Sequence, residues 1–568
     1  MLYLSLAQKI IKHTNMNTTY KTLFIILICS FCFLLGAFIS EEKQKIDRTD
    51  IVHAEKLISI ELSEAEIDSI MSLLDEQKLS YDNMRKFKLS NNVPPAYNFN
   101  PVPVGKTFDS EQKVFETSDY SSAILPADIN AIAYYSIGQL AQLIRNKKIS
   151  SVQLTNFFLD RLKKYSPDLH CVITYTDSLA LQQARLADEE ISGGIYRGLL
   201  HGIPYGLKDM YATENYRTTY GTPPYKDQYI HENATIVKML NDAGAILIAK
   251  LSLGELAMDD VWFEGRTRNP WDTSKGSSGS SAGPASAVSA GLLPFAIGSE
   301  TWGSIVSPST VCGVTGLRPT YGRVSRTGAM ALSWTMDKVG PLCRNVEDCA
   351  IVFKAIYGPD GKDQTLVNLP FNYSPEIDLK NLKIGFFKSD FDQDTVNRSF
   401  NNAAIEMLRQ MGAQLISIDL PDFPVYDMSV LLLCEAASAF EELTLSGRDD
   451  EMVQQNKYSW PGLFRAANFI PATEYIRANR LRYLLIQQME EIMKQVDVCI
   501  APSLAGNNLL ITNFTGHPSV VIPNGFIDPK KPTSIVFTGQ LYDEGILLAV
   551  VKKYQDATDF HLKHPPGF

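Results

Sequence analysis

From about residue 134 the chain alternates short apolar runs with segments whose apolar residues recur at helical spacing. The runs that indicate buried strands are Ile203–Met210, Ala245–Ala249, Leu382–Phe387 and Gln414–Ile418. The segments that indicate helices are 137–144, 152–162, 234–243 and 403–412. This alternation predicts an α/β fold, with helices on both faces of one sheet.

The N-terminus carries the pattern of an export signal. Residues 1–21 are basic, and an uncharged apolar run follows from Leu23 to Ile39. Its 17 residues fall between the core of a signal peptide and the roughly 20 that a membrane span needs. Basic residues before such a run send the rest of the chain outward. We therefore expect residues 22–40 to be a signal peptide or signal anchor, and the protein to be extracytoplasmic: periplasmic or secreted, and held on a membrane if the segment is not cleaved.

The composition of the chain limits which partners and cofactors we expect. The 53 basic and 63 acidic residues give a net charge of −10, which disfavours general nucleic-acid binding. Eight cysteines in 568 residues do not form a disulfide scaffold. No zinc-ligand spacing is present, and the sequence implies neither a metal nor an organic cofactor.

Residues 41–127 are expected to form a helical and extended N-terminal arm. Ser63 and Glu66 have the spacing of a capping box before a segment of helical periodicity. Residues 90–127 are rich in Pro, Asn and Ser, which favours an extended segment that wraps the main body.

The stretch 274–310 is dominated by Ser, Gly and Ala. Such a composition is typical of a flexible linker. Here, however, the apolar run Leu292–Ile297 interrupts it and indicates a buried strand. Small residues on either side of a core strand point instead to backbone packed close to a ligand.

Several motifs in and around this stretch resemble the amidase signature family, in the family's order over roughly residues 134–560. They are His201–Asp209, Gly265–Asp272, Gly279–Gly283, Gly298–Val306, Gly316–Ser325 and Asp337–Pro341. The resemblance, to an exported bacterial type of amidase, implies the amidase signature fold for residues 128–568: one large mixed β-sheet with helices on both faces. It also implies hydrolysis of a small-molecule or peptide amide to a carboxylic acid and ammonia or an amine.

The resemblance assigns a Ser–cis-Ser–Lys triad to three positions: Ser304 as nucleophile, Ser280 as bridging serine and Lys208 as base. It also implies an oxyanion hole at the backbone N–H groups of Thr301, Trp302, Gly303 and Ser304. Physical chemistry is compatible with this assignment, because a serine needs a base and burial can keep a lysine neutral. Asp209 either orients the lysine loop or is a polar turn residue.

Three positions depart from the family pattern. Trp302 stands where the family has Gly, so this position is expected not to need a positive φ, and its side chain is a candidate wall of the acyl pocket. Glu300 replaces Asp and Val306 replaces Arg. If the two family residues pair, Glu300 must find another donor or carry a raised pKa.

Other interpretations remain open. Gly279–Gly283 also matches G-x-S-x-G, which would make the protein an α/β-hydrolase with Ser281 as nucleophile and His517 as base, although no strand precedes the motif. Within the family, the alternatives are the glutaminase (A) subunit of a tRNA-dependent amidotransferase and a catalytically inactive binding protein. The export signal argues against the first, as does the missing Arg at position 306, which could have anchored an acidic substrate. A homodimer is left open.

Overall fold

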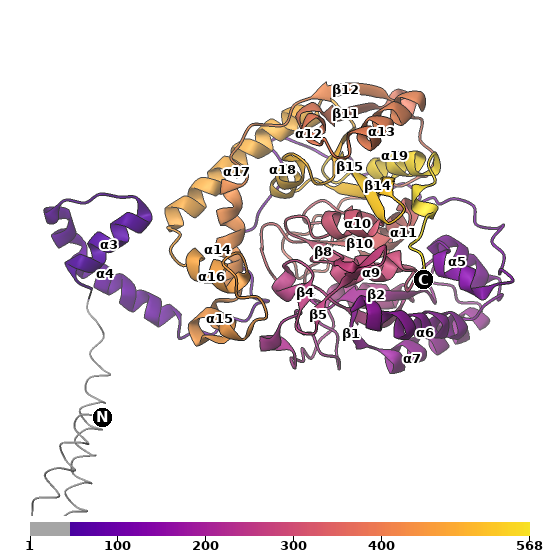
Figure 1. Cartoon of the computed structure of the whole chain (residues 1–568), viewed down its shortest axis with the longest axis horizontal. Helices are drawn as coiled ribbons and strands as arrows, with labels where there is room; N and C mark the ends of the chain where they lie inside the picture. Colours follow the sequence, from indigo (N-terminus) through magenta and orange to yellow (C-terminus); the bar gives the residue numbers. More distant parts are fainter. Residues whose placement is uncertain (1–45) are drawn as a thin grey trace, which may run out of the picture. The chain divides into compact units, whose positions relative to one another are not determined.

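The computed structural model describes residues 46–568, and the chain divides between Leu89 and Ser90 into two compact units (Figure 1). The described part of the first unit contains helices α3 (Arg48–Ile58) and α4 (Glu64–Met84). The predicted capping box begins α4, where the Ser63 N–H donates to Glu66 Oε2 at 2.7 Å. The apolar run and the signal predicted at 22–40 lie outside the described residues. Within residues 46–568, no helix is both long and apolar enough to cross a membrane.

The second unit is built on one sheet of eleven strands, in the order β1-β3-β2-β8-β10-β9-β14-β15-β13-β11-β12. The strands are β1 (Val172–Tyr175), β2 (Pro204–Lys208), β3 (Ile246–Leu251), β8 (Phe295–Glu300), β9 (Thr315–Arg318), β10 (Lys338–Cys343), β11 (Lys383–Phe387), β12 (Gln414–Ile418), β13 (Val498–Pro502), β14 (Ser519–Asp528) and β15 (Lys531–Gly539). β2 is parallel to β3 and β8, and β11 is parallel to β12 and β13, whereas the other pairs are antiparallel. The predicted α/β class with a mixed sheet is therefore confirmed.

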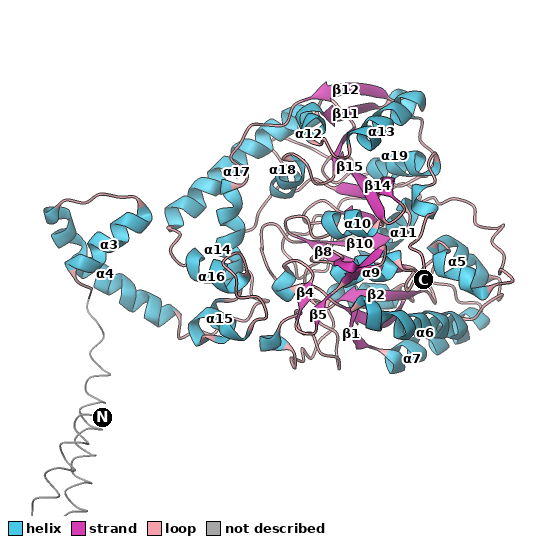
Figure 2. Ribbon diagram, viewed as in Figure 1, coloured by secondary structure: helices cyan, strands magenta, loops and turns pink. Residues whose placement is uncertain are grey.

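Helices cover both faces of this sheet, as the colouring by secondary structure shows (Figure 2). They are α5 (Ile137–Arg145), α6 (Ser151–Leu169), α7 (Asp177–Ser192), α8 (Thr235–Asp242), α9 (Ala282–Ser289), α10 (Val306–Cys312), α11 (Val346–Ile356), α12 (Lys388–Gln393), α13 (Arg398–Gln410), α14 (Val430–Ala439), α15 (Glu441–Ser446), α16 (Trp460–Ala467), α17 (Ala472–Met493), α18 (Asn508–Thr515) and α19 (Glu544–Asp556). Two short hairpins, β4 (Val261–Trp262) with β5 (Gly265–Arg266) and β6 (Arg268–Asn269) with β7 (Asp272–Gly276), lie outside the sheet.

The strands that position the site are buried on both faces. Every residue of β2, β3 and β8 is buried, which explains why they read as continuous apolar runs rather than as alternating ones. β8 begins at Phe295, three residues later than its apolar run begins. Pro294 accounts for the shift, because proline has no N–H to donate to a sheet ladder.

Residues 90–127 contain no helix or strand and pack along the second unit. Asn91 is hydrogen-bonded to both backbone groups of Ala331. Farther along, Lys106 pairs with Glu490 at 2.5 Å. These contacts hold an extended segment of the kind that its Pro and Asn content indicates.

Candidate active site

Lys208 is the last residue of β2, which lies between β3 and β8 in the sheet. Its side chain is fully buried, and its Nζ lies within hydrogen-bond distance of three serine hydroxyls. These are Ser280 Oγ at 2.8 Å, Ser299 Oγ at 2.9 Å and Ser281 Oγ at 3.3 Å. The structure thus brings the predicted base and the predicted bridging serine together.

Burial lowers the pKa of Lys208 to about 7, because an ammonium ion loses its hydration in the interior. The carboxylates of Asp337 and Glu300 act in the opposite direction and favour the charged form. A lysine with this pKa is partly neutral near pH 7 and can accept a proton.

Ser280 and Ser281 lie in the loop between β7 and α9, and the Gly279–Ser280 peptide bond is cis, as the family resemblance implies. Ser281 ties this loop to β8. Its Oγ donates to Ser299 O at 3.1 Å and accepts from Ser299 N at 3.2 Å. Its own N–H donates to Ser304 O at 3.1 Å, so the loops of the two predicted triad serines are directly joined.

Ser304 lies in the turn between β8 and α10. Glu300 shapes this turn, because its Oε2 accepts from Ile305 N at 2.8 Å and Val306 N at 2.9 Å. For the N–H groups of residues 301–304, by contrast, no acceptor occurs among residues 46–568. Gly303 has a φ of +135°, and an added Cβ would lie 3.1 Å from Leu509 Cδ2. Only glycine adopts this backbone conformation without strain.

Glu300 finds its charge partner in Arg318 of β9, whose Nη1 donates to Oε1 at 2.7 Å. Asn513 of α18 donates to the same oxygen at 2.9 Å. Burial raises the pKa of Glu300, but Arg318, the Val306 N–H and Lys338 together outweigh it, and the pKa of the carboxyl stays below its ordinary value. Arg318 therefore supplies the hydrogen-bond donor for Glu300 that Val306 cannot provide.

Val306 itself is buried against Val521 and Val536. Position 306 therefore faces the core rather than the surface of the site. The prediction that an Arg at position 306 could anchor an acidic substrate is therefore wrong, because the side chain at this position packs against Val521 and Val536.

Trp302 has no positive φ, as its side chain predicts. Its ring is half-buried and packs edge-to-face on Phe514 of α18, with centroids 5.2 Å apart. Trp302 thus contacts α18 through Phe514, and a Cβ added at Gly303 would meet Leu509 of the same helix.

Asp209 is more than a turn residue. Its Oδ1 lies 2.8 Å from Lys250 Nζ in a fully buried ion pair. Its Oδ2 accepts from both the N–H and the hydroxyl of Thr219. These contacts fix the backbone immediately after Lys208.

The α/β-hydrolase interpretation is wrong. β7 ends at Gly276, so no strand leads directly into Ser281, and the Ser281 hydroxyl is engaged by Ser299. The Nδ1 of His517 lies 2.8 Å from Thr515 Oγ1, and burial lowers the pKa of His517 to about 3. His517 is a buried structural residue and not a base for Ser281.

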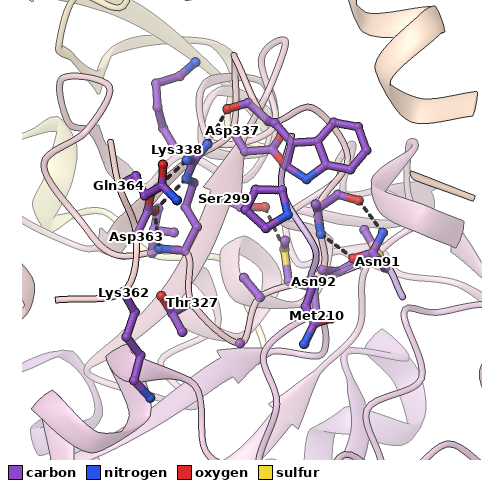
Figure 3. A pocket seen from close by; sticks show the side chains of 18 of the residues that line it. Asn91, Asn92, Met210, Ser299, Thr327, Asp337, Lys338, Lys362, Asp363 and Gln364 are labelled. Atoms are coloured by element: carbon purple, nitrogen blue, oxygen red, sulfur yellow. Dashed lines mark hydrogen bonds and ion pairs between the residues drawn. The ribbon is translucent and has the colours of Figure 1, made fainter. Parts of the chain in front are cut away.

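A cavity of about 170 Å³ borders the lysine through Met210 and Ser299, which both line it (Figure 3). Asp337 also lines the cavity, and its carboxylate accepts from Thr301 Oγ1 at 2.6 Å and from the N–H groups of Leu332 and Ser333. Sequence reasoning missed Ser299, Met210 and Asp337 as neighbours of the site, although Ser299 and Asp337 stand inside recognised motifs. No cluster of His, Cys, Asp and Glu suited to a metal ion occurs in residues 46–568.

The chain is similar to several known proteins. The family model described as Amidase matches residues 153–525. The (A) subunit of the glutamyl-tRNA(Gln) amidotransferase of Coxiella burnetii is 32% identical over 479 residues, which cover 76% of this chain and 99% of the relative. The solved structure of native peptide amidase from Stenotrophomonas maltophilia has a TM-score of 0.70 at 28% identity, over 77% of this chain and 99% of that one. A bacterial aryl acylamidase of the amidase signature family, 21% identical over 76% and 98% of the two chains, shares the fold with a TM-score of 0.69.

These relatives contradict the predicted extracytoplasmic location. The curated proteins that match most of the chain are named for glutamyl-tRNA(Gln), and tRNA is a molecule of the cell interior. The prediction was wrong because it inferred the cellular compartment of the protein from one apolar segment. The run at 23–39 has 17 residues, fewer than the roughly 20 of a membrane span, and hydropathy alone does not fix a destination.

The family model covers most of the chain, and the solved neighbours share both its sheet and its amide-hydrolysing class. The buried lysine and the serine loops lie within the matched residues. This chain therefore belongs to the amidase family and is an amide-hydrolysing enzyme.

Proposed function

We propose that this enzyme hydrolyses a carboxylic amide with Ser304 as nucleophile, Ser280 as proton bridge and Lys208 as base. The observation that carries the proposal is the buried contact of 2.8 Å between Lys208 Nζ and Ser280 Oγ. A lysine with a pKa of about 7 is a suitable base near neutral pH. The hydrogen bond from Ser281 N–H to Ser304 O joins the loop of the bridging Ser280 to the turn of the nucleophile Ser304.

The reaction then runs as acyl transfer in two halves. Ser304 Oγ attacks the amide carbon, its proton passes to Ser280, and the Ser280 proton passes to Lys208. The N–H groups of residues 301–304, which have no acceptor within the described chain, stabilise the oxyanion. The amine leaves with the proton that returns through Ser280, and water hydrolyses the acyl ester on Ser304.

Ammonia or amine release from a panel of amides tests this proposal. The panel contains small aliphatic and aromatic amides, peptide amides and glutamine. Wild-type enzyme should turn over at least one of them, and Ser304→Ala and Lys208→Ala should lower kcat by at least about a thousandfold, as removal of a nucleophile or its base does in other serine hydrolases. Full activity in either variant would overturn the assignment.

A second candidate function is favoured by the curated relatives, which are named as the (A) subunit of a glutamyl-tRNA(Gln) amidotransferase. The chain covers 99% of the length of such a relative. In this role Ser304 would release ammonia from an amide donor such as glutamine, and partner subunits would use it. The net charge of −10 fits a division of labour in which another subunit contacts the tRNA.

The same panel separates the two candidates. A preference for glutamine, with a rate that rises when partner subunits are added, supports the amidotransferase role. A preference for aryl or peptide amides, with full activity of the chain alone, supports a free-standing amidase. A homodimer remains a prediction, which the mass of the active species in solution checks.

A further inference from the structure

The three serine hydroxyls around Lys208 differ in the acceptors to which they donate their own protons. An ammonium at Lys208 can donate to all three of its serine neighbours, because it carries three N–H groups. The neutral amine that acts as base has two N–H groups and one lone pair. Its lone pair must face Ser280, because Ser280 is the hydroxyl that has to give it a proton.

Ser281 cannot donate to this lone pair. Its hydroxyl proton goes to the backbone oxygen of Ser299 at 3.1 Å. A serine hydroxyl has a single proton, so toward Lys208 Nζ the Ser281 oxygen acts only as an acceptor. The backbone of β8, which is part of the sheet, enforces this direction.

The direction of the Ser299 hydroxyl proton is set by a side chain rather than by the backbone. The Ser299 hydroxyl donates to the sulfur of Met210 at 2.9 Å (Figure 3). The same oxygen accepts from Lys208 Nζ at 2.9 Å. Met210 is 3% exposed and follows two residues after Lys208, just past the end of β2. A thioether is a weak acceptor, but within the described chain it is the only acceptor that the structure gives this proton.

We propose that Met210 is a positioning residue: by holding the Ser299 proton, its sulfur keeps the lone pair of neutral Lys208 on Ser280. This inference rests on the proposed triad and adds to it the element that orients the base. With two hydroxyls restricted to accepting, the two N–H groups of the amine are taken by Ser281 and Ser299, and Ser280 is left as the donor.

Replacing Met210 by leucine keeps the volume and removes the acceptor. The freed Ser299 proton then turns to the nearest acceptor, which is the Lys208 amine. The lone pair is shared between Ser299 and Ser280, and a fraction of the enzyme is unproductive. We expect kcat to fall about 3- to 10-fold, the span that one hydrogen bond of ordinary net strength controls. The loss should appear in kcat more than in KM, because the substitution acts on proton transfer to Lys208.

The experiment measures kcat and KM of Met210→Leu, Met210→Gln and Met489→Leu on the preferred amide. Met489 of α17 is the matched control: it is buried like Met210, it does not line the cavity, and its side chain makes no hydrogen bond within the described residues. Met210→Gln restores an acceptor at similar length, so it should recover most of the lost kcat. Met489→Leu should match the wild type.

Three results would overturn the inference. They are a wild-type kcat in Met210→Leu, an equal loss in Met489→Leu, and a Met210→Gln variant no better than Met210→Leu. Melting curves recorded alongside identify any variant that has lost its fold. Lys208→Ala and Ser304→Ala in the same assay distinguish failure of the triad from failure of the role of Met210. Activity in these two variants refutes the triad. Wild-type activity of Met210→Leu, with both triad variants inactive, refutes only the role of Met210.

Discussion

Arg318 Nη1 lies 2.7 Å from Glu300 Oε1 in a fully buried ion pair. The second carboxylate oxygen of Glu300 holds the N–H groups of Ile305 and Val306, directly after Ser304. The guanidinium is itself fixed, because its Nη2 donates to His517 O and Ser519 Oγ. The turn of the proposed nucleophile is therefore anchored to β9 and to the start of β14 through one carboxylate.

Glu300→Gln should destabilise the protein strongly. The amide keeps the size of the side chain but leaves Arg318 as a buried charge without a counter-charge, which typically costs about 3–5 kcal/mol. Urea denaturation measures the change in the free energy of unfolding. Glu406→Gln is the control, because it breaks an exposed pair with Arg409 that is expected to contribute less than about 1 kcal/mol. Equal losses in the two variants would contradict the role of Glu300.

Gly303→Ala should impair catalysis. The φ of +135° is open to glycine alone, and the new Cβ would meet Leu509 at 3.1 Å. A strain of about 1–3 kcal/mol in the turn corresponds to a loss of about 5- to 150-fold in kcat/KM. Gly447→Ala is the control: Gly447 has a φ of +72° with no atom within 4 Å of its Cβ position, and it ends α15, which carries none of the proposed triad residues. A normal rate in Gly303→Ala would show that this turn tolerates rearrangement.

The pH dependence of kcat/KM should report Lys208. Burial lowers the pKa of this lysine to about 7, and only its neutral form accepts a proton. Activity should therefore rise as the pH increases through about 7 and should fall below it, where the amine is protonated. A profile that stays flat from pH 5 to 9 would mean that Lys208 does not titrate in the free enzyme as its burial requires.

Asp337→Asn should move this acid limb to lower pH. The pKa of Lys208 is set mainly by burial, and the carboxylates of Asp337 and Glu300 raise it toward its ordinary value. Removal of one negative charge favours the neutral amine, so the lysine stays deprotonated in more acidic solution. Asparagine keeps an oxygen that can accept from Thr301 Oγ1. A limb that stays in place or moves upward contradicts the electrostatic link.

The sequence predicted the parts of the fold that depend on local pattern. β12 has the bounds of its apolar run, and the helix predicted at 234–243 is α8, Thr235–Asp242. Continuous apolar runs and helical periodicity are local properties, so they can be read without a structure. β8 begins later than its run because a proline blocks its first residues.

The contacts that complete the site could not be predicted, because they join distant segments. Glu300 is held by Asn513, which lies 213 residues away, and no periodicity relates the two. Ser299 is one of the three serines around Lys208, and it faces the lysine because β2 pairs with β8. A substitution such as Val306 for Arg signals that a partner is missing but does not say which residue replaces it.

The most direct test of the central claim is to trap the acyl-enzyme. An activated ester or a slowly released amide is mixed with the enzyme, the reaction is quenched in acid, and peptide mass spectrometry locates the acyl group. The account predicts an acyl group on Ser304, absent in Ser304→Ala and formed much more slowly in Lys208→Ala. An acyl group on Ser281 or Ser280 in the wild type, or equal acylation of the Ser304→Ala variant, would contradict it.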